Sequence, residues 1–175
     1  MVYEGEEEDE DAGALFAHAK NPNVGPHAGW KPHETPEESL KIIETLFMPN
    51  NTWALSLKEN GEIIGSIGLE PDKRRPGVNS KELGYWLAEP YWGRGLMTEA
   101  ANAVIDFAFK KLPLELLAVC TGPKNDRSKR IIEKCGFIYE GTERKSYRTY
   151  NGEIRDSKCY SLLREEWEKK GNEYG

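Results

Sequence analysis

The chain has 175 residues and a mass of 19.9 kDa, so we expect one domain over residues 1–175. Hydrophobic residues make up 38% of the sequence, which excludes a wholly disordered chain, and no apolar run approaches the ~20 residues of a membrane span, which excludes an integral membrane protein. The formal net charge is −6, and it originates in an acidic run within residues 1–11. Seven acidic residues form this run: Glu4, Glu6, Glu7, Glu8, Asp9, Glu10 and Asp11. Removing their charges leaves +1, so a strongly basic protein that binds nucleic acid is not expected.

The first elements that we expect are a short strand at Val2 and two helices. Apolar residues on one face predict a helix over residues 11–20. A second helix begins after Thr35, because Thr35 can cap it and Glu38 completes a capping box. Its predicted buried stripe consists of Leu40, Ile43, Leu46 and Phe47.

The middle of the chain changes to the period-two alternation of β-strands. Residues 52–58 and 62–69 flank Asn60-Gly61, and this dipeptide favours a hairpin turn. A third strand is predicted over residues 81–88, after a polar loop at residues 72–80.

A long helix is predicted from Leu96 to the residue before Pro113. Its predicted core face consists of Leu96, Ala100, Ala103, Val104, Phe107 and Ala108. The last predicted elements are a strand at 114–121, a helix at 126–135, two strands at 137–147 and 153–163, and a charged tail at 166–175. The order (β)-α-α-β-β-β-α-β-α-β-β indicates an α/β fold, with a mixed sheet and helices on both faces.

Three cysteines, Cys120, Cys135 and Cys159, lie far apart in the sequence and form no C-x-x-C motif. This spacing indicates neither a zinc site nor a disulfide framework. The N-terminus lacks the basic and apolar regions of a signal peptide. We therefore expect reduced thiols, no bound metal and a cytoplasmic protein.

The turn before the long helix has the features of an anion site. Gly93 and Gly95 lack Cβ atoms, so a phosphate can approach the backbone, and the first amides of the helix have no intrahelical partner. Leu96 stands where a Walker A motif has lysine, and Thr98 stands where a Rossmann fingerprint has its third glycine. The sequence therefore supports neither ATP hydrolysis nor NAD binding. Two glycines in an ordinary tight turn are the alternative explanation.

Three motifs together resemble the GNAT acyl-CoA N-acyltransferases. They are Glu82-Leu-Gly-Tyr-Trp-Leu87, Trp92-Gly-Arg-Gly-Leu-Met-Thr98, and Asn125-x-x-Ser128 before Gly136-Phe137. The similarity is greatest to the RimJ/RimL-like branch, whose members acetylate protein N-termini and other amines. The resemblance implies a GNAT fold with a mostly antiparallel sheet of about six to seven strands. It also implies acetyl-CoA as cosubstrate, direct transfer to an amine in a ternary complex, and a split between the strands at 82–88 and 114–121.

The resemblance assigns a set of residues to acetyl-CoA. These are Trp86, Leu87, Trp92, Gly93, Arg94, Gly95, Leu96, Met97, Thr98, Asn125 and Ser128. Trp92 replaces a Gln or Arg of the family, and Met97 replaces a small residue whose larger substitute is expected to point outward. Basic residues at 124–134 are candidates for the phosphates of CoA, or they form an ordinary solvated face.

The catalytic candidates also come from the resemblance. Glu82 is the first choice for the general base and Glu70 the second, with a solvent-facing carboxylate as the alternative for each. Ser128 is a candidate for protonating the departing thiolate, or it is a small residue packed against CoA. A tyrosine that has this role in many family members is replaced by Ile132.

The expected acceptor site contains Trp30, His33, Glu70 and Tyr85. For Trp30 and His33 the alternative is an ordinary loop that is held in place by one buried tryptophan. The acceptor itself is expected to be a protein N-terminal amine, and the alternatives are a small-molecule amine or a non-catalytic module that binds acyl-CoA. The acidic run near the N-terminus either attracts a cationic amine or only solvates the terminus. A homodimer formed through the last two strands is a further possibility.

Overall fold

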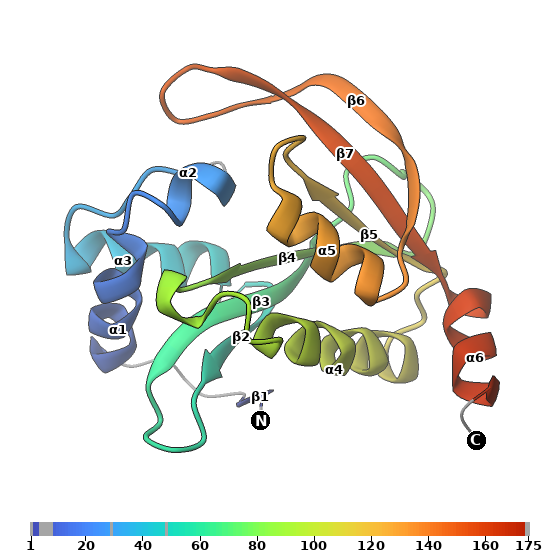
Figure 1. Cartoon of the computed structure of the whole chain (residues 1–175), viewed down its shortest axis with the longest axis horizontal. Coiled ribbons are helices and arrows are strands. Elements are labelled where there is room, and N and C mark those ends of the chain that lie inside the picture. Colours follow the sequence, from blue (N-terminus) through green and yellow to red (C-terminus); the bar gives the residue numbers. More distant parts are fainter. Residues whose placement is uncertain (1, 4–8, 29, 48, 174–175) are drawn as a thin grey trace.

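The computed structural model describes residues 2–3, 9–28, 30–47 and 49–173 (Figure 1). Within them, seven strands form one sheet in the order β1-β2-β3-β4-β5-β7-β6. The strands are β1 Val2–Tyr3, β2 Asn51–Ser56, β3 Ile63–Pro71, β4 Ser80–Leu87, β5 Leu116–Thr121, β6 Ile138–Arg148 and β7 Ile154–Leu163. Every neighbouring pair is antiparallel except β4 and β5. The fold is therefore a mixed α/β fold with a mostly antiparallel sheet.

The sheet is split between its two parallel strands. β4 pairs with β5 only at Ser80–Glu82, opposite Leu116–Ala118, and the register goes no further. Beyond Glu82 the side chain of Tyr85 contacts Ser128 of the helix that follows β5. The split expected from the resemblance is thus present, and Glu82 stands at its vertex.

Helices cover both faces of the sheet (Figure 1). The long helix α4 (Leu96–Lys111) packs on the face that carries Leu83, and α1 (Asp9–Ala19) packs with Trp86 on the opposite face. Side chains alternate along a strand, so odd and even residues of β4 face opposite layers. The remaining helices are α2 Gly25–Ala28, α3 Pro36–Ile42, η1 Ile43–Phe47, η2 Glu89–Tyr91, α5 Asp126–Lys134 and α6 Arg164–Glu173.

The structure confirms the predicted N-cap of α3, but one hydrogen bond of the capping box has a different donor from the predicted one. The Thr35 hydroxyl accepts a hydrogen bond from the Glu38 amide at 3.2 Å. The Glu38 carboxylate accepts from the Glu34 amide at 2.7 Å, one residue before the expected partner. Both bonds satisfy amides at the entrance of the helix.

Three residues that were predicted to be buried in the core are exposed. Leu46 is 43% exposed and Phe107 is 36% exposed, and Ala103 is also exposed. On α4 the buried face is rotated from the predicted one, because it contacts the curved sheet through Ala101, Ile105 and Phe109. Phe107 lies at the rim of this interface, where its ring meets Trp53 edge to face at 5.2 Å.

The charged tail that we predicted is a helix, α6. Its Trp167 stacks on Phe109 with ring centroids 5.3 Å apart. Arg164 donates to the carbonyl oxygens of Phe109, Leu112 and Leu114 at 2.7–2.9 Å, and thereby binds the carboxyl end of α4. These contacts depend on residues distant in the sequence, which explains why composition alone predicted only a charged tail and no helix.

β6 forms one edge of the sheet, and its Ile138 and Tyr139 are 55% and 52% exposed. Pairing with a second copy at the ends of the last two strands stays a prediction. No helix in the described part of the chain is long and apolar enough to cross a membrane.

Candidate active site

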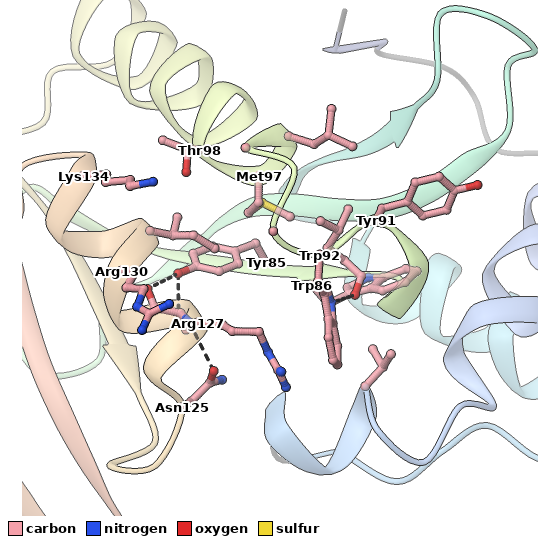
Figure 2. A pocket seen from close by; sticks show the side chains of 17 residues that line it. Tyr85, Trp86, Tyr91, Trp92, Met97, Thr98, Asn125, Arg127, Arg130 and Lys134 are labelled. Carbon is pink, nitrogen blue, oxygen red and sulfur yellow. Dashed lines mark hydrogen bonds between the residues drawn. The ribbon is translucent and has the colours of Figure 1, made fainter.

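A cavity of about 490 Å³ lies where β4, the start of α4 and α5 meet (Figure 2). Eleven of its lining residues were singled out in the sequence: Tyr85, Trp86, Leu87, Trp92, Gly93, Gly95, Leu96, Met97, Thr98, Asn125 and Ser128. The opening of the sheet beyond Glu82 makes room for this cavity, because β4 has no β5 neighbour there.

The amino end of α4 forms one wall. Gly93 and Gly95 adopt φ angles of +74° and +81°, which glycine reaches without strain. The turn precedes the first amides of the helix, at Leu96, Met97 and Thr98, which have no intrahelical acceptors and belong to residues that line the cavity. Met97 corrects one expectation, since its side chain is only 2% exposed and packs into the core instead of pointing outward.

Positive side chains form the opposite lip. Arg127, Arg130 and Lys134 of α5 line the cavity, and none of its described lining residues is an Asp or Glu. The Arg127 guanidinium lies 3.9 Å from the centre of the Trp92 ring, a cation–π contact. Trp92 is fixed in turn by a bond from its Nε1 to the Leu87 carbonyl, at 2.7 Å.

Arg94 is placed differently from the other residues of the glycine turn. It is exposed, lies 5.5 Å from the Tyr91 ring, and is absent from the cavity lining. The charge on the cavity wall therefore comes from α5 and not from the turn.

Asn125, Ser128 and Tyr85 form a hydrogen-bonded chain in the cavity. Dashed lines in Figure 2 mark these bonds at the labelled Tyr85 and Asn125. Asn125 caps α5 by accepting from the Ser128 amide at 3.2 Å. The hydroxyl oxygens of Ser128 and Tyr85 are 2.8 Å apart. Burial raises the pKa of the Tyr85 hydroxyl, so Tyr85 stays neutral and can donate a hydrogen bond.

Ile132 does not face this chain. Its side chain is 1% exposed and belongs to the core beneath α5, whereas the neighbouring Ile131 lines the cavity. Tyr85 thus brings a tyrosine hydroxyl to Ser128 from β4. The sequence marked Tyr85 for the acceptor site, and periodicity gave no indication of its contact with α5.

Glu82 lies on the other face of β4, at the vertex of the split. It pairs with Glu70 of β3 in the sheet register, and its carboxylate is 3.6 Å from Arg74. Burial raises the pKa of Glu82, while the nearby Arg74 guanidinium opposes this shift. Neither Glu82 nor Glu70 lines the cavity.

Trp30 and His33 pack together on the same face as Glu82. Their ring centroids are 5.2 Å apart, and Trp30 meets Trp86 edge to face at 6.4 Å. The His33 ring is hydrogen-bonded through Nδ1 to the Ser39 hydroxyl at 2.7 Å, and burial lowers the pKa of His33. Trp86 is therefore the residue that joins these predicted acceptor residues to the cavity.

Two features near Glu82 were missed in the sequence. Arg74, in what looked like an ordinary polar loop, donates to Cys120 Sγ at 2.6 Å. Cys120 and Cys159, far apart in sequence, are directly opposite in β5 and β7 with their sulfur atoms 3.2 Å apart. Only the register of the sheet brings them together. No group of three or more potential metal ligands was found among the described residues.

Residues 6–138 match the family model described as an acetyltransferase (GNAT) domain. The chain belongs to the GNAT acetyltransferase family. GNAT proteins are acetyl-CoA-dependent N-acyltransferases, and the fold, the split sheet and the glycine turn agree with this assignment. The match covers most of the chain, up to the first residue of β6.

Among curated relatives, this GNAT protein is 37% identical over 110 residues to the "Putative ribosomal N-acetyltransferase YdaF" of Bacillus subtilis. That alignment covers 62% of the chain and 58% of YdaF, so the chain spans little more than half the length of this relative.

Two solved structures share the fold. The ribosomal-protein-S5-alanine acetyltransferase of Vibrio fischeri has a TM-score of 0.73 and 23% identity, covering 95% of this chain and 98% of that one. The spermidine N-acetyltransferase of Vibrio cholerae, solved with CoA and spermine, has a TM-score of 0.78 and 19% identity, covering 95% and 96%. At these identities the similarity shows the fold alone.

Proposed function

We propose that this protein transfers the acetyl group of acetyl-CoA to a protein N-terminal α-amine. The observation that carries the proposal is the cavity: it combines the free amides of a helix start with three cationic side chains, and no described lining residue is acidic. Such a wall favours a ligand with several phosphate groups, as CoA has.

The described residues suggest how the cosubstrate is held. The pyrophosphate binds the amides at the start of α4, and Arg127, Arg130 and Lys134 neutralise the phosphates. Trp92 has no charge to offer, and it instead holds the Arg127 guanidinium against its ring. The pantetheine arm runs along Trp86 and Leu87, where β4 has no β5 partner and its edge is open.

Glu82 accepts the proton that the amine loses. A lysine-like amine has a pKa of about 10.4 and is mostly protonated at pH 7, whereas an α-amine has a pKa of about 7.7–8.0 and needs less assistance. Burial makes Glu82 a stronger base than an exposed carboxylate, which suits this role. The Tyr85 hydroxyl donates to Ser128, and the Ser128 hydroxyl donates a hydrogen bond toward the departing thiolate.

The choice of a protein acceptor is supported by the names of two similar proteins, YdaF and the S5-alanine acetyltransferase. A small amine is the second candidate, because the spermidine acetyltransferase has an equally similar fold. The face that carries Trp30, His33 and Glu82 is the place where this choice is made.

Thiol release from acetyl-CoA tests the proposal. The acceptors are an alanine-starting peptide that contains one lysine, the same peptide with a blocked N-terminus, spermidine, and an amino sugar. We expect release with the free peptide only, and mass spectrometry should locate the acetyl group on its α-amine. Faster release with spermidine or the amino sugar would assign a small-molecule acceptor, and CoA binding without any release would assign a non-catalytic module.

A pair of variants of α5 tests the cosubstrate site. Arg127→Gln removes the charge beside Trp92, whereas Lys129→Gln removes one on the same helix outside the cavity. Calorimetry should show acetyl-CoA binding weakened about 10- to 100-fold by the first change, since a charge-assisted bond contributes about 1.5–3 kcal/mol, and nearly unchanged by the second. Equal losses in both variants would contradict the proposed site.

A further inference from the structure

The surroundings of Glu82 are crowded with charge at the vertex of the sheet split. Arg74 reaches it from the loop between β3 and β4, with 3.6 Å between Nη2 and Oε2. The same guanidinium lies 3.7 Å from Asp72 through Nε and donates to Cys120 Sγ through Nη1. Asp72 of the same loop and Cys120 of β5 thus contact two nitrogens of the Arg74 guanidinium, and the third, Nη2, faces Glu82.

Without Arg74, acidic groups would dominate around Glu82. In the described part of the chain, the charged and titratable groups that face Glu82 are Glu70 of β3, Asp72 and Arg74 of the loop, and the Cys120 thiol of β5. Glu70 and Asp72 both disfavour a charge on Glu82, and burial does so too. Arg74 is the cation of this group, and its Nη2 is buried with no hydrogen bond among the described residues.

We infer that Arg74 is a positioning residue for Glu82, which holds the carboxylate at the vertex of the split and keeps it in its ionised, proton-accepting form. This inference rests on the proposed function in one respect, the assignment of Glu82 as the base. Burial raises the pKa of Glu82, which makes it a stronger base, and the Arg74 guanidinium opposes that rise.

The charge on Arg74 can be removed in two ways and retained in one. Arg74→Gln and Arg74→Met both remove it, and the second keeps most of the apolar stem if the first does not fold. Arg74→Lys keeps the charge. Arg75→Gln is the matched control, because Arg75 lies in the same loop, is similarly buried, and pairs with Asp72 and Glu140 instead of Glu82.

The first readout is the pKa of Glu82, measured by NMR on glutamate labelled at the carboxyl carbon, with the signal assigned through Glu82→Gln. Removing an opposite charge at this distance should raise that pKa by about one unit or more. Arg74→Lys and Arg75→Gln should stay within about 0.3 unit of the unchanged protein. An unmoved pKa in a folded Arg74→Gln or Arg74→Met protein, or an equal rise in Arg75→Gln, would overturn the inference.

The second readout is the pH profile of kcat/KM. In Arg74→Gln the acid limb of the profile should move to higher pH by as many pH units as the pKa of Glu82 rises. At a pH below this limb, kcat/KM should fall about tenfold for each pH unit of that shift. The KM for acetyl-CoA should be unchanged, because Arg74 does not line the cavity. If Glu82→Gln retains full activity, Glu82 is not the general base. The NMR titration still tests whether Arg74 lowers the pKa of Glu82. An unmoved limb with an inactive Glu82→Gln would refute the role of Arg74 alone.

Discussion

The pairing of Ser128 with Tyr85 limits what each hydroxyl can contribute. A thiol has a pKa of about 8.5, well below that of an alcohol or a buried tyrosine, so neither hydroxyl can transfer its proton fully to a thiolate. Ser128 can donate a hydrogen bond to it, and Tyr85 orients Ser128 by donating to its hydroxyl at 2.8 Å. This geometry explains why the loss of a tyrosine at Ile132 need not abolish the chemistry.

Ser128→Ala should therefore lower kcat about 10- to 100-fold, because one preorganised donor to a developing negative charge is lost. Tyr85→Phe should lower it less, about threefold to tenfold, since Tyr85 acts through Ser128. Steady-state kinetics should show little change in the KM for acetyl-CoA. Ser146→Ala, in the exposed part of β6, is the control. Full activity in Ser128→Ala would exclude the assigned role.

Glu82 should also affect stability in a pH-dependent way. Its folded pKa is raised by burial, so the folded chain binds more protons than the unfolded chain above pH of about 4.3, the ordinary value for Glu. Stability from this group is thus present at low pH and is lost as pH rises through the raised pKa. Urea midpoints should show that Glu82→Gln gains stability over the unchanged protein between pH 4 and pH 7.5. A difference that stays constant or shrinks would contradict the raised pKa.

Among the structural elements, the turn before α4 combines a backbone requirement with a binding role. Gly95 has a φ of +81° and Gly61 one of +74°, and a Cβ at either position would meet nothing within 4 Å. Alanine is therefore strained equally at both positions, by about 1–2 kcal/mol, for conformational and not steric reasons. The two glycines differ in location, since Gly61 follows β2 in a hairpin and Gly95 lines the cavity.

Gly95→Ala and Gly61→Ala should consequently lose similar amounts of unfolding free energy in urea. Only Gly95→Ala should also weaken acetyl-CoA binding, because its backbone amides must keep their direction to meet phosphate. Calorimetry on the two folded variants separates these effects. Equal acetyl-CoA affinities in the two variants would mean that the helix start does not hold the cosubstrate.

At the scale of the whole molecule, one bond connects the late hairpin to the early helices. β6 and β7 arch over the sheet toward α2 (Figure 1), and Arg155 of β7 donates to the Pro26 carbonyl of α2 at 2.7 Å. The two segments are 129 residues apart in the chain. The strand order brings β7 beside β5, and Arg155 of β7 thereby reaches α2.

Arg155→Ala should loosen this connection and raise the KM for the acceptor about tenfold, which corresponds to the loss of one charge-assisted bond of about 1.5 kcal/mol. The KM for acetyl-CoA should stay unchanged, because Arg155 does not line the cavity. Arg148→Ala is the control, since Arg148 bonds to Gly152 within its own hairpin. An equal effect of both variants on the acceptor would argue against a specific role for the connection.

Local patterns in the sequence determined most elements of this protein. The cap at Thr35, the turn at Gly61 and the glycines before α4 act through bonds and dihedral angles within a few residues, so their spacing is informative. Hydrophobic periodicity located the strands, although it misplaced the buried face of α4, because the phase of a helix depends on the surface that it meets.

The sequence by itself thus determined the order of the strands and of α1, α3, α4 and α5, the glycine turn and, through a resemblance, the family of the chain. The tertiary structure alone decided that Tyr85 meets Ser128, that Arg74 lies beside Glu82, and that α6 closes onto α4. The physical reason is that strand pairing and helix packing bring together residues that are far apart in sequence. Burial at the resulting contacts then sets pKa values and charges that no local pattern contains.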